Sequence, residues 1–373
     1  MDMKWSFDRQ KPFNQLPNLP PPDDIIDKEI LVTWGLASRN LAALNKNLQS
    51  LPDPLLLIHT VSLREAKSSS EIENIFTSDD ELYKAISDSV REENASGETK
   101  EVLRYREALW AGYNDIKQTG VITRDTLVKI FQQIKNTSQT IRSPHSRVVI
   151  RRGDSSFQTS EVIYTPPRGE GVVQAYLDNL IEYLNEENAR NLDPLIRMAI
   201  SHYQFEAIHP FSDGNGRTGR ILCLLYLITK DLLSLPVLYL SKYIIENKQD
   251  YYFGLAGVSQ RGDWKGWILY ILKAVQYTSA YTNRLIDDIM EQTLSTLEFG
   301  KASLKWYSKD VNEMLFRQPY FKPSLINQAL GRKSRTTLTK YMDELIGLGI
   351  ISPLREGKEV YYLNNDLVRI LED

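Results

Sequence analysis

The stretch HPFSDGNGRTGR, residues 209–220, carries the most specific chemistry in the sequence. It lies between two helical patterns, the second of which we expect from about Thr218 to Thr229. A glycine-containing loop that opens onto a helix N-terminus presents unpaired backbone N–H groups and the positive end of the helix dipole. The stretch is therefore typical of a site that binds an anion such as phosphate.

The side chains of this stretch fit phosphate chemistry. Arg217 and Arg220 stand one helical turn apart, so both guanidinium groups can face one polyanion. Asp213 offers a hard oxygen ligand for Mg²⁺, and His209 can accept a proton near neutral pH. The alternative is a polar turn between two helices, with capping glycines and surface arginines. Such a turn needs neither the histidine nor both arginines, so we favour the phosphate site.

Other phosphate-binding motifs do not fit. Gly214, Gly216 and Gly219 satisfy the pattern GxGxxG, but a dinucleotide-binding fold needs a strand before the loop, and here a helix precedes it. The sequence has neither the HRD and DFG motifs of a protein kinase nor a GxxxxGK[ST] phosphate loop.

Composition restricts the class of protein. The chain has 373 residues, of which 42% are apolar and 25% charged, which predicts two or three globular domains and excludes a disordered chain. A net charge of −3 shows no overall basic excess, and the single cysteine, Cys223, excludes internal disulfides. The N-terminus lacks the apolar core of a signal peptide, and the apolar run 221–228 is too short to span a membrane. We therefore expect a soluble cytoplasmic protein without a membrane partner.

The hydrophobic patterns predict a mainly α protein. We expect an N-terminal helical region over 1–100, a helical core over 101–298 and a separate domain over 301–373. One β-hairpin is expected in the core, from the strands Arg147–Ile150 and Glu161–Tyr164 around a turn at 153–156. The last helix of the core is expected from about Asp263 to Leu297.

Residues 301–373 differ from the rest of the chain in charge, with 12 basic and nine acidic side chains. Their patterns predict three helices and then two strands, at Ser308–Arg317, Pro323–Leu330, Ser334–Leu348, 350–354 and 359–363. This order is that of a winged helix-turn-helix domain.

The stretch 209–220 resembles the signature of the Fic (filamentation induced by cAMP) family, His-x-Phe-x-Asp/Glu-Gly-Asn-Gly-Arg-x-x-Arg, at every fixed position. The resemblance implies a helical Fic core whose β-hairpin serves as a flap beside the target. It also implies a protein adenylyltransferase that transfers AMP from ATP, with Mg²⁺, to a hydroxyl side chain (Ser, Thr or Tyr) of a target protein. Self-modification and a homodimer would fit the family.

The resemblance also assigns roles to residues. His209 would be the general base, Phe211 an anchor of the loop, and Asp213 the ligand of Mg²⁺. The anion hole, the two arginines and a tyrosine pair further along the chain would bind the nucleotide. These nucleotide-binding candidates are Gly214, Asn215, Gly216, Arg217, Thr218, Gly219, Arg220, Glu246, Tyr251 and Tyr252.

A second family pattern, Ser/Thr-x-x-x-Glu-Gly/Asn, fits Ser69, Glu73 and Asn74. In Fic proteins this motif belongs to an inhibitory helix, so the resemblance implies that Glu73 pairs with Arg220 and holds ATP in an unproductive pose. The alternative is a capping box, in which Ser70 and Glu73 begin a helix without any regulatory role.

The C-terminal domain supports a rival hypothesis. Basic residues and threonines crowd its third helix and could contact the phosphates and base edges of DNA; they are Arg332, Lys333, Arg335, Lys340, Thr336, Thr337 and Thr339. The chain could thus be a nucleotide-sensing, DNA-binding regulator, or the domain could dock a protein or a second copy. Removal of AMP at the same site is a further alternative. His202 is interpreted as a buried core histidine.

Overall fold

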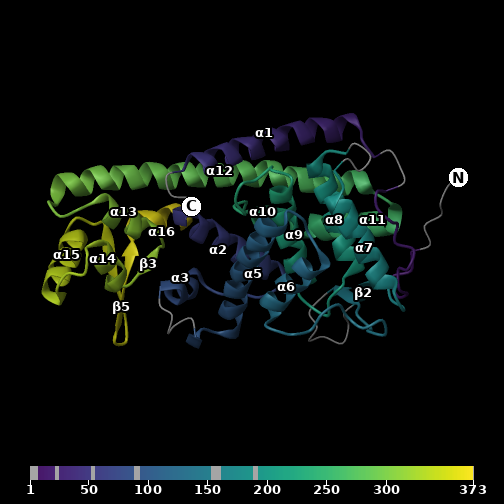
Figure 1. Ribbon diagram of the computed structural model, residues 1–373, viewed down its shortest axis with the longest axis horizontal. Coiled ribbons are helices and arrows are strands. Elements are labelled where there is room, and N and C mark those ends of the chain that lie inside the picture. The colour runs from purple at the N-terminus through teal and green to yellow at the C-terminus, as the bar shows by residue number, and fades with distance from the viewer. Residues whose placement is uncertain are drawn as a thin grey trace.

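A computed structural model describes residues 7–21, 25–51, 55–87, 93–152, 161–187 and 192–372. The protein is mainly helical (Figure 1). Its helices are α1 (Lys28–Ser50), α2 (Leu55–Ile72), α3 (Asp79–Ser87), α5 (Gly97–Thr119), α6 (Arg124–Lys135), α7 (Val172–Asn185), α8 (Pro194–Ile208), α9 (Asn215–Thr229), α10 (Leu240–Glu246), α11 (Lys248–Arg261), α12 (Trp264–Ser303), α13 (Lys309–Phe316), α14 (Pro323–Ala329), α15 (Arg335–Gly347) and α16 (Asn365–Glu372).

Helices α8 and α9 form the centre of the larger part of the molecule. Every residue of α8 from Leu195 to Ile208 is buried, and so are nearly all residues of α9. Helices that are buried around their whole circumference require neighbours on every side. Helices α5, α6, α7 and α12 supply these neighbours and so fix the loop between α8 and α9.

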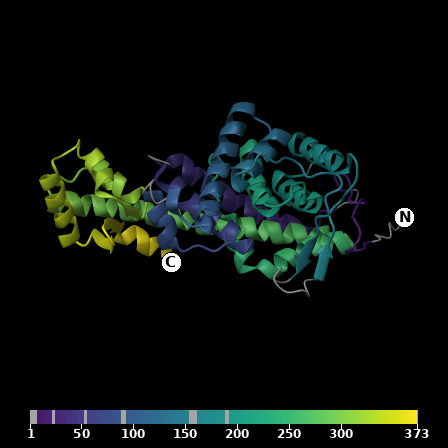
Figure 2. The ribbon, with the colours of Figure 1, turned by 90° about the horizontal axis from the view of Figure 1, so that it is seen from below.

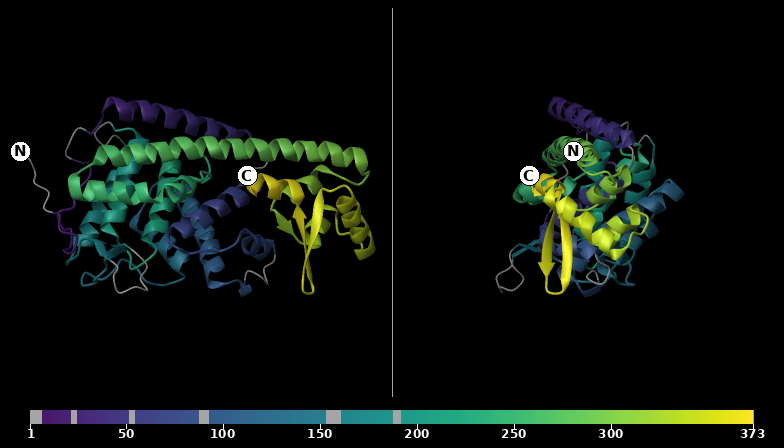
Figure 3. Two further views of the ribbon diagram at one scale, coloured as in Figure 1. Left: turned by 180° about the vertical axis from the view of Figure 1, so that it is seen from behind. Right: turned by 90° about the vertical axis from the view of Figure 1, so that its left-hand side faces the viewer.

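Helix α12 is the longest element. Its 40 residues extend over about 60 Å, and α1 packs along it (Figures 1 and 3). It continues to Ser303, six residues beyond the expected end, because the C-terminal part packs on its last turns. Asn312, for example, donates a side-chain hydrogen bond to the carbonyl oxygen of Thr293 (2.9 Å). The domain boundaries remain a prediction.

The hairpin of the core is present, but its first strand begins later than expected. Strand β1 (Ile150–Arg152) pairs antiparallel with β2 (Glu161–Tyr164). Ile150 already faces Tyr164, the last residue of β2, and two prolines follow shortly at 166–167. Proline has no N–H to donate, so 147–149 have no strand to pair with. The expected turn at 153–156 lies outside the described residues.

The C-terminal part lies at one end of the molecule (Figure 2). Helices α13, α14 and α15 precede strands β4 (Ile351–Glu356) and β5 (Glu359–Asn364), in the expected order. A short strand, β3 (Tyr320–Phe321), and α16 were not expected. The sheet has the order β3-β5-β4, because β3 pairs with the free edge of β5. That this part is a winged helix-turn-helix stays a prediction.

None of the helices among the described residues has the length and apolar character needed to cross a membrane.

Candidate active site

The loop between α8 and α9 is held by its own residues. Phe211 is fully buried and stacks on Phe131, with 4.2 Å between the ring centroids. The side chain of Asn215 closes the loop by accepting from the N–H of Phe211 and donating to its carbonyl oxygen, both at 2.9 Å. Gly214 has a φ of 74°, a left-handed conformation that favours glycine, and it caps the N-terminus of α9. The backbone N–H groups of α9 are thereby left pointing toward the space above the loop.

Arg142 fixes the loop from outside, and nothing in the sequence singled it out. Its guanidinium donates to the carbonyl oxygens of His209 (2.8 Å), Ile208 (3.2 Å) and Pro167 (2.6 Å). Its own N–H donates to the carbonyl oxygen of Pro210 (2.9 Å). All four acceptors are backbone atoms distant in sequence, so no side-chain pattern could reveal this role.

His209 is placed as a neutral base. It ends α8 with a φ of 51°, a strained backbone conformation for a residue other than glycine. Among the described residues its Nδ1 atom is buried and has no hydrogen-bond partner. Burial, together with the charge of Arg142, lowers the pKa of His209 to about 4. The imidazole is thus uncharged at pH 7 and able to accept a proton.

Asp213 lies at the edge of the site. Its Oδ2 atom forms an ion pair with Nζ of Lys135 (2.8 Å), and its Oδ1 accepts from the N–H of Gly214 (2.6 Å). Burial alone would raise the pKa of this carboxyl, but the hydrogen bond and charge of Lys135 lower it. The described residues contain no cluster of three acidic, histidine or cysteine side chains that could enclose a metal. One ionised carboxylate beside an anion-binding loop does fit a Mg²⁺ ion held mainly by substrate phosphates.

The two arginines of α9 are buried, each only 1% exposed, and they have different partners. Arg217 pairs with Glu101 of α5 (2.6 Å). Arg220 pairs with Oε1 of Glu73 (2.7 Å) and donates to Oγ (2.8 Å) and the carbonyl oxygen of Ser69 (2.7 Å). The sequence predicted that Arg217 and Arg220 face one polyanion. In this structure each guanidinium is instead paired with its own carboxylate.

Glu73 also covers the first turn of α9. A Cβ atom added at Gly216 would lie 2.1 Å from Oε1 of Glu73, which is far below any contact distance. The Glu73 carboxylate thus occupies the space that a side chain at position 216 would need, and glycine leaves this space open. Glu73 lies on Arg220 as expected, and Ser69 of the same sequence pattern also contacts Arg220, which was not predicted.

The capping-box alternative is wrong, because Ser70 and Glu73 lie at the end of a helix and not at its beginning. The N–H of Ile75 donates to the carbonyl oxygen of Ser70, and that of Asn74 to Glu71, both at 3.0 Å. With Asn74 at a φ of 61°, these bonds form a Schellman motif at the end of α2. The left-handed position explains why the pattern requires glycine or asparagine after Glu73. We call residues 70–75 the Glu73 turn.

The remaining nucleotide-binding candidates lie in three environments. Thr218 and Gly219 face the interior: the hydroxyl of Thr218 donates to the carbonyl oxygen of Gly214, and Gly219 packs on α8. Tyr251 is buried beneath the half-buried Tyr252. Glu246 is exposed and pairs with a lysine of its own helix, so nothing directs it toward the loop.

The interpretation of His202 as a core residue is confirmed. It is buried, shares a hydrogen bond of 2.9 Å with the Tyr251 hydroxyl, and burial lowers its pKa to about 3.

Two buried glutamates at the site were missed. Glu206 lies one turn before His209, against Gly219, with its Oε1 buried and unpartnered among the described residues. Burial raises its pKa to about 8, which Arg220 partly opposes. Glu65 accepts from the hydroxyls of Tyr105 (3.0 Å) and Ser241 (2.6 Å) and from the N–H of Ser241 (2.8 Å). Both lie in helical patterns that the sequence assigned to ordinary packing.

Comparison with known protein families gives three matches along the chain. Residues 32–114 match the Fic/DOC family N-terminal model, and residues 121–227 match the Fic/DOC family model. Residues 289–367 match the C-terminal domain of the protein adenylyltransferase SoFic-like family. Together these matches cover more than half of the chain.

Two curated relatives are named protein adenylyltransferase. A protein adenylyltransferase, fic-1 of Caenorhabditis elegans, is 30% identical over 154 residues, covering 41% of this chain and 28% of the relative. Protein adenylyltransferase Fic of Drosophila grimshawi is 24% identical over 261 residues, covering 66% of this chain and 50% of the relative. The chain thus spans half or less of the length of these relatives.

Solved structures share the fold. A Fic family protein from Desulfovibrio desulfuricans superposes with a TM-score of 0.55 at 21% identity, covering 92% of this chain and 98% of that one. A fragment of C. elegans Fic-1 gives a TM-score of 0.51 at 20% identity, covering 68% and 71%.

Proposed function

The chain belongs to the Fic family, and from this premise we propose that it is a protein adenylyltransferase that Glu73 holds in an inhibited state. It transfers AMP from ATP to a serine, threonine or tyrosine hydroxyl of a target protein. The curated relatives named protein adenylyltransferase support this reaction class.

The reaction assigns a distinct task to each part of the loop. The target hydroxyl oxygen bonds to the α-phosphorus of ATP, the bond to pyrophosphate breaks, and the hydroxyl proton passes to the imidazole of His209. The neutral state of that imidazole at pH 7 suits this task. The N–H groups at the start of α9 bind phosphate oxygens, and Arg217 and Arg220 hold the rest of the polyphosphate.

Asp213 would hold Mg²⁺, and Lys135 would have to yield its ion pair with that carboxylate. When bound, the ion would neutralise charge on the phosphates and on the departing pyrophosphate.

One observation carries the inhibited state: the Glu73 carboxylate occupies both Arg220 and the space above Gly216. A phosphate group that binds the N-terminus of α9 needs the same space and the same guanidinium. Glu73 and a productively bound ATP therefore compete for one position.

Labelled ATP tests the proposal by self-labelling, which requires no knowledge of the target. Glu73→Gly should raise incorporation at least tenfold over the wild type, because Arg220 becomes free for phosphate. Glu71→Gln, which removes a charge in the same last turn of α2 and keeps a good helix former there, should give no gain, since Glu71 faces Lys67. The double variant Glu73→Gly/Arg220→Ala should lose the gain. Equal or lower labelling by a folded Glu73→Gly variant would contradict the inhibited state.

Removal of AMP by the same site is the alternative direction of the chemistry. Incubation of a pre-labelled target with wild type and with Glu73→Gly separates the two directions, because an adenylyltransferase leaves the label in place.

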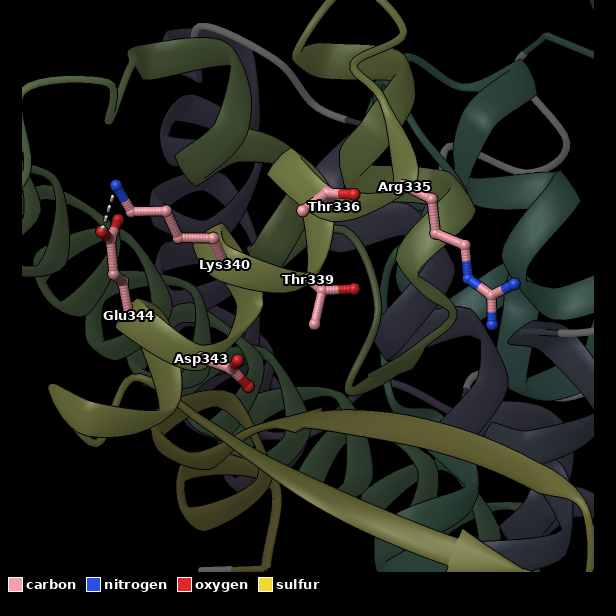
Figure 4. A pocket seen from close by; sticks show the side chains of 6 residues that line it. All are labelled: Arg335, Thr336, Thr339, Lys340, Asp343 and Glu344. Carbon is pink, nitrogen blue, oxygen red and sulfur yellow. Dashed lines mark ion pairs between the residues drawn. The ribbon is translucent and has the colours of Figure 1, made fainter.

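DNA binding by the C-terminal part is a second candidate function, and the exposed face of α15 favours it. Arg335, Thr336 and Thr339 line a shallow hollow on this face together with Lys340, Asp343 and Glu344 (Figure 4). Lys340 pairs with Glu344 (3.7 Å), whereas Arg335 has no ion pair among the described residues. A titration with duplex DNA at two salt concentrations tests this function, since phosphate contacts give a salt-dependent affinity.

A further inference from the structure

Helix α3 begins three residues after the Glu73 turn, and contacts with α2 and α5 hold its N-terminal end in place. Nζ of Lys67, on α2, pairs with Oδ2 of Asp79 at the start of α3 (2.8 Å). Between them, the hydroxyls of Thr77 and Thr99 share a hydrogen bond of 2.6 Å, which ties this segment to α5. A displacement of α3 therefore pulls directly on the end of α2, where Glu73 lies.

The other side of α3 contacts the C-terminal part of the chain, more than 230 residues later in the sequence. The rings of Tyr83 and Tyr320 lie with centroids 5.3 Å apart, and both side chains are buried. Nζ of Lys84 pairs with Oε2 of Glu356 in the β4–β5 hairpin (3.1 Å). The views from the front and from behind both show α3 beside this sheet (Figures 1 and 3).

Helix α3 is thus the shortest connection between the C-terminal part and the carboxylate on Arg220. The long helix α12 also joins the two parts, but it packs on α1, α8, α10 and α11, and the contact it makes with α2 is a hydrogen bond from Arg64 to the Tyr281 hydroxyl (3.4 Å), nine residues before Glu73. Only α3 among the described elements contacts the C-terminal sheet on one side and continues into the Glu73 turn on the other.

We propose that α3 couples the C-terminal part to the inhibitory contact, so that release of the C-terminal sheet from α3 loosens the Glu73 turn and frees Arg220. This proposal rests on the proposed inhibition by Glu73 and adds the element that controls it. Because coupling between two sites is reciprocal, nucleotide binding that displaces Glu73 also weakens the contact between α3 and the C-terminal sheet.

Glu356→Lys tests the coupling, because it places a positive charge against Lys84 in the full-length chain. The matched control is Glu359→Lys, the same charge change on the same hairpin, where the lost partner is Lys322 within the C-terminal part. Two quantities are measured: self-labelling with ATP, and hydrogen exchange of the backbone N–H groups of residues 73–75. The second requires no enzymatic activity.

The coupling predicts that Glu356→Lys raises labelling about two- to fivefold, which corresponds to the loss of one partly exposed ion pair. It also predicts faster exchange at residues 73–75, with neither change in Glu359→Lys. In the Glu73→Gly background, Glu356→Lys should add nothing further. Unchanged exchange at 73–75, or unchanged or lower labelling in a folded Glu356→Lys variant, overturns the coupling.

A failure of the proposed function gives a different result. In that case Glu73→Gly itself does not label, while the exchange measurement still reports whether α3 and the Glu73 turn move together.

Discussion

Two groups of arginines lie near the N-termini of two helices, α9 and α15, and they differ in burial. Arg217 and Arg220 of α9 are 1% exposed and each has a carboxylate partner. Arg332, in the turn before α15, and Arg335, the first residue of α15, are exposed and have no ion pair among the described residues. A buried guanidinium needs a carboxylate or another anion beside it, whereas the charge of an exposed guanidinium is solvated by water and screened by salt. An anion that binds the buried arginines must therefore displace a carboxylate, whereas an anion that binds the exposed arginines displaces only water and salt ions.

The first prediction attacks the chemistry of the buried region. His209→Ala, made in the Glu73→Gly background, should lower the rate of AMP transfer about 10²- to 10⁴-fold, because the target hydroxyl loses its base. Binding of ATP, measured by fluorescence titration, should change little. His145→Ala, which removes an exposed histidine, is the control and should leave the rate unchanged. Wild-type transfer by the His209 variant would remove this residue from the mechanism.

The second prediction concerns the neutralising anion itself. Glu73→Gly leaves the buried Arg220 without its carboxylate, which should cost about 3 kcal/mol of stability in the absence of nucleotide. ATP should restore much of this loss, because its phosphates replace the carboxylate. Thermal unfolding with and without ATP measures both effects. A variant as stable as the wild type, with no larger shift on ATP addition, would mean that Arg220 does not exchange anions.

The third prediction uses the buried Glu206, whose folded pKa of about 8 lies above its unfolded value. Between about pH 4.5 and 8 the unfolded chain releases this proton while the folded protein keeps it, so stability falls as the pH rises through this window. Glu206→Gln cannot ionise and should avoid the loss. Relative to the wild type, the variant should gain roughly 1–3 kcal/mol between pH 5 and pH 8. The measurement is chemical denaturation at both pH values, and a difference independent of pH would contradict the raised pKa.

The fourth prediction concerns the exposed group and is the smallest. If α15 contacts the phosphates of DNA, Arg335→Ala should weaken binding by about 1 kcal/mol or less and lower the salt slope by about one. Arg369→Ala, on α16, supplies a control because Arg369 pairs with Asp366. Affinities of wild type and variants at two salt concentrations decide the matter. No binding even at low salt would leave α15 as a surface for protein contacts.

Local features of the sequence predicted much of the fold. The sequence predicts helices over 194–207 and from about 218 to 229, and α8 and α9 span 194–208 and 215–229, so the largest difference is three residues at the start of α9. The agreement is close because the apolar patterns and caps of these helices lie in neighbouring residues. From Asp80 to about Gln118 the sequence predicts helical patterns without locating a break, and the structure divides this stretch into α3 and α5. The division places α3 on the C-terminal sheet, a contact that no short pattern encodes.

The candidate site divides in the same way. The sequence by itself determined the loop of residues 209–220, because the glycines and the helix start of an anion-binding site lie in one short segment together with a histidine that can act as a base. It also indicated Glu73, although 147 residues separate it from Arg220. That indication came from the resemblance to a family, since spacing alone was equally compatible with a cap.

Only the tertiary structure decided how these groups are used. It placed Glu73 at a helix end, separated the partners of Arg217 and Arg220, and brought Arg142 onto the backbone of His209. It also buried Glu206, which raises the pKa of that carboxyl. The physical reason is that burial and pairing depend on which distant segments pack together. A charged side chain has one chemistry in water and another beside a single chosen partner in the interior.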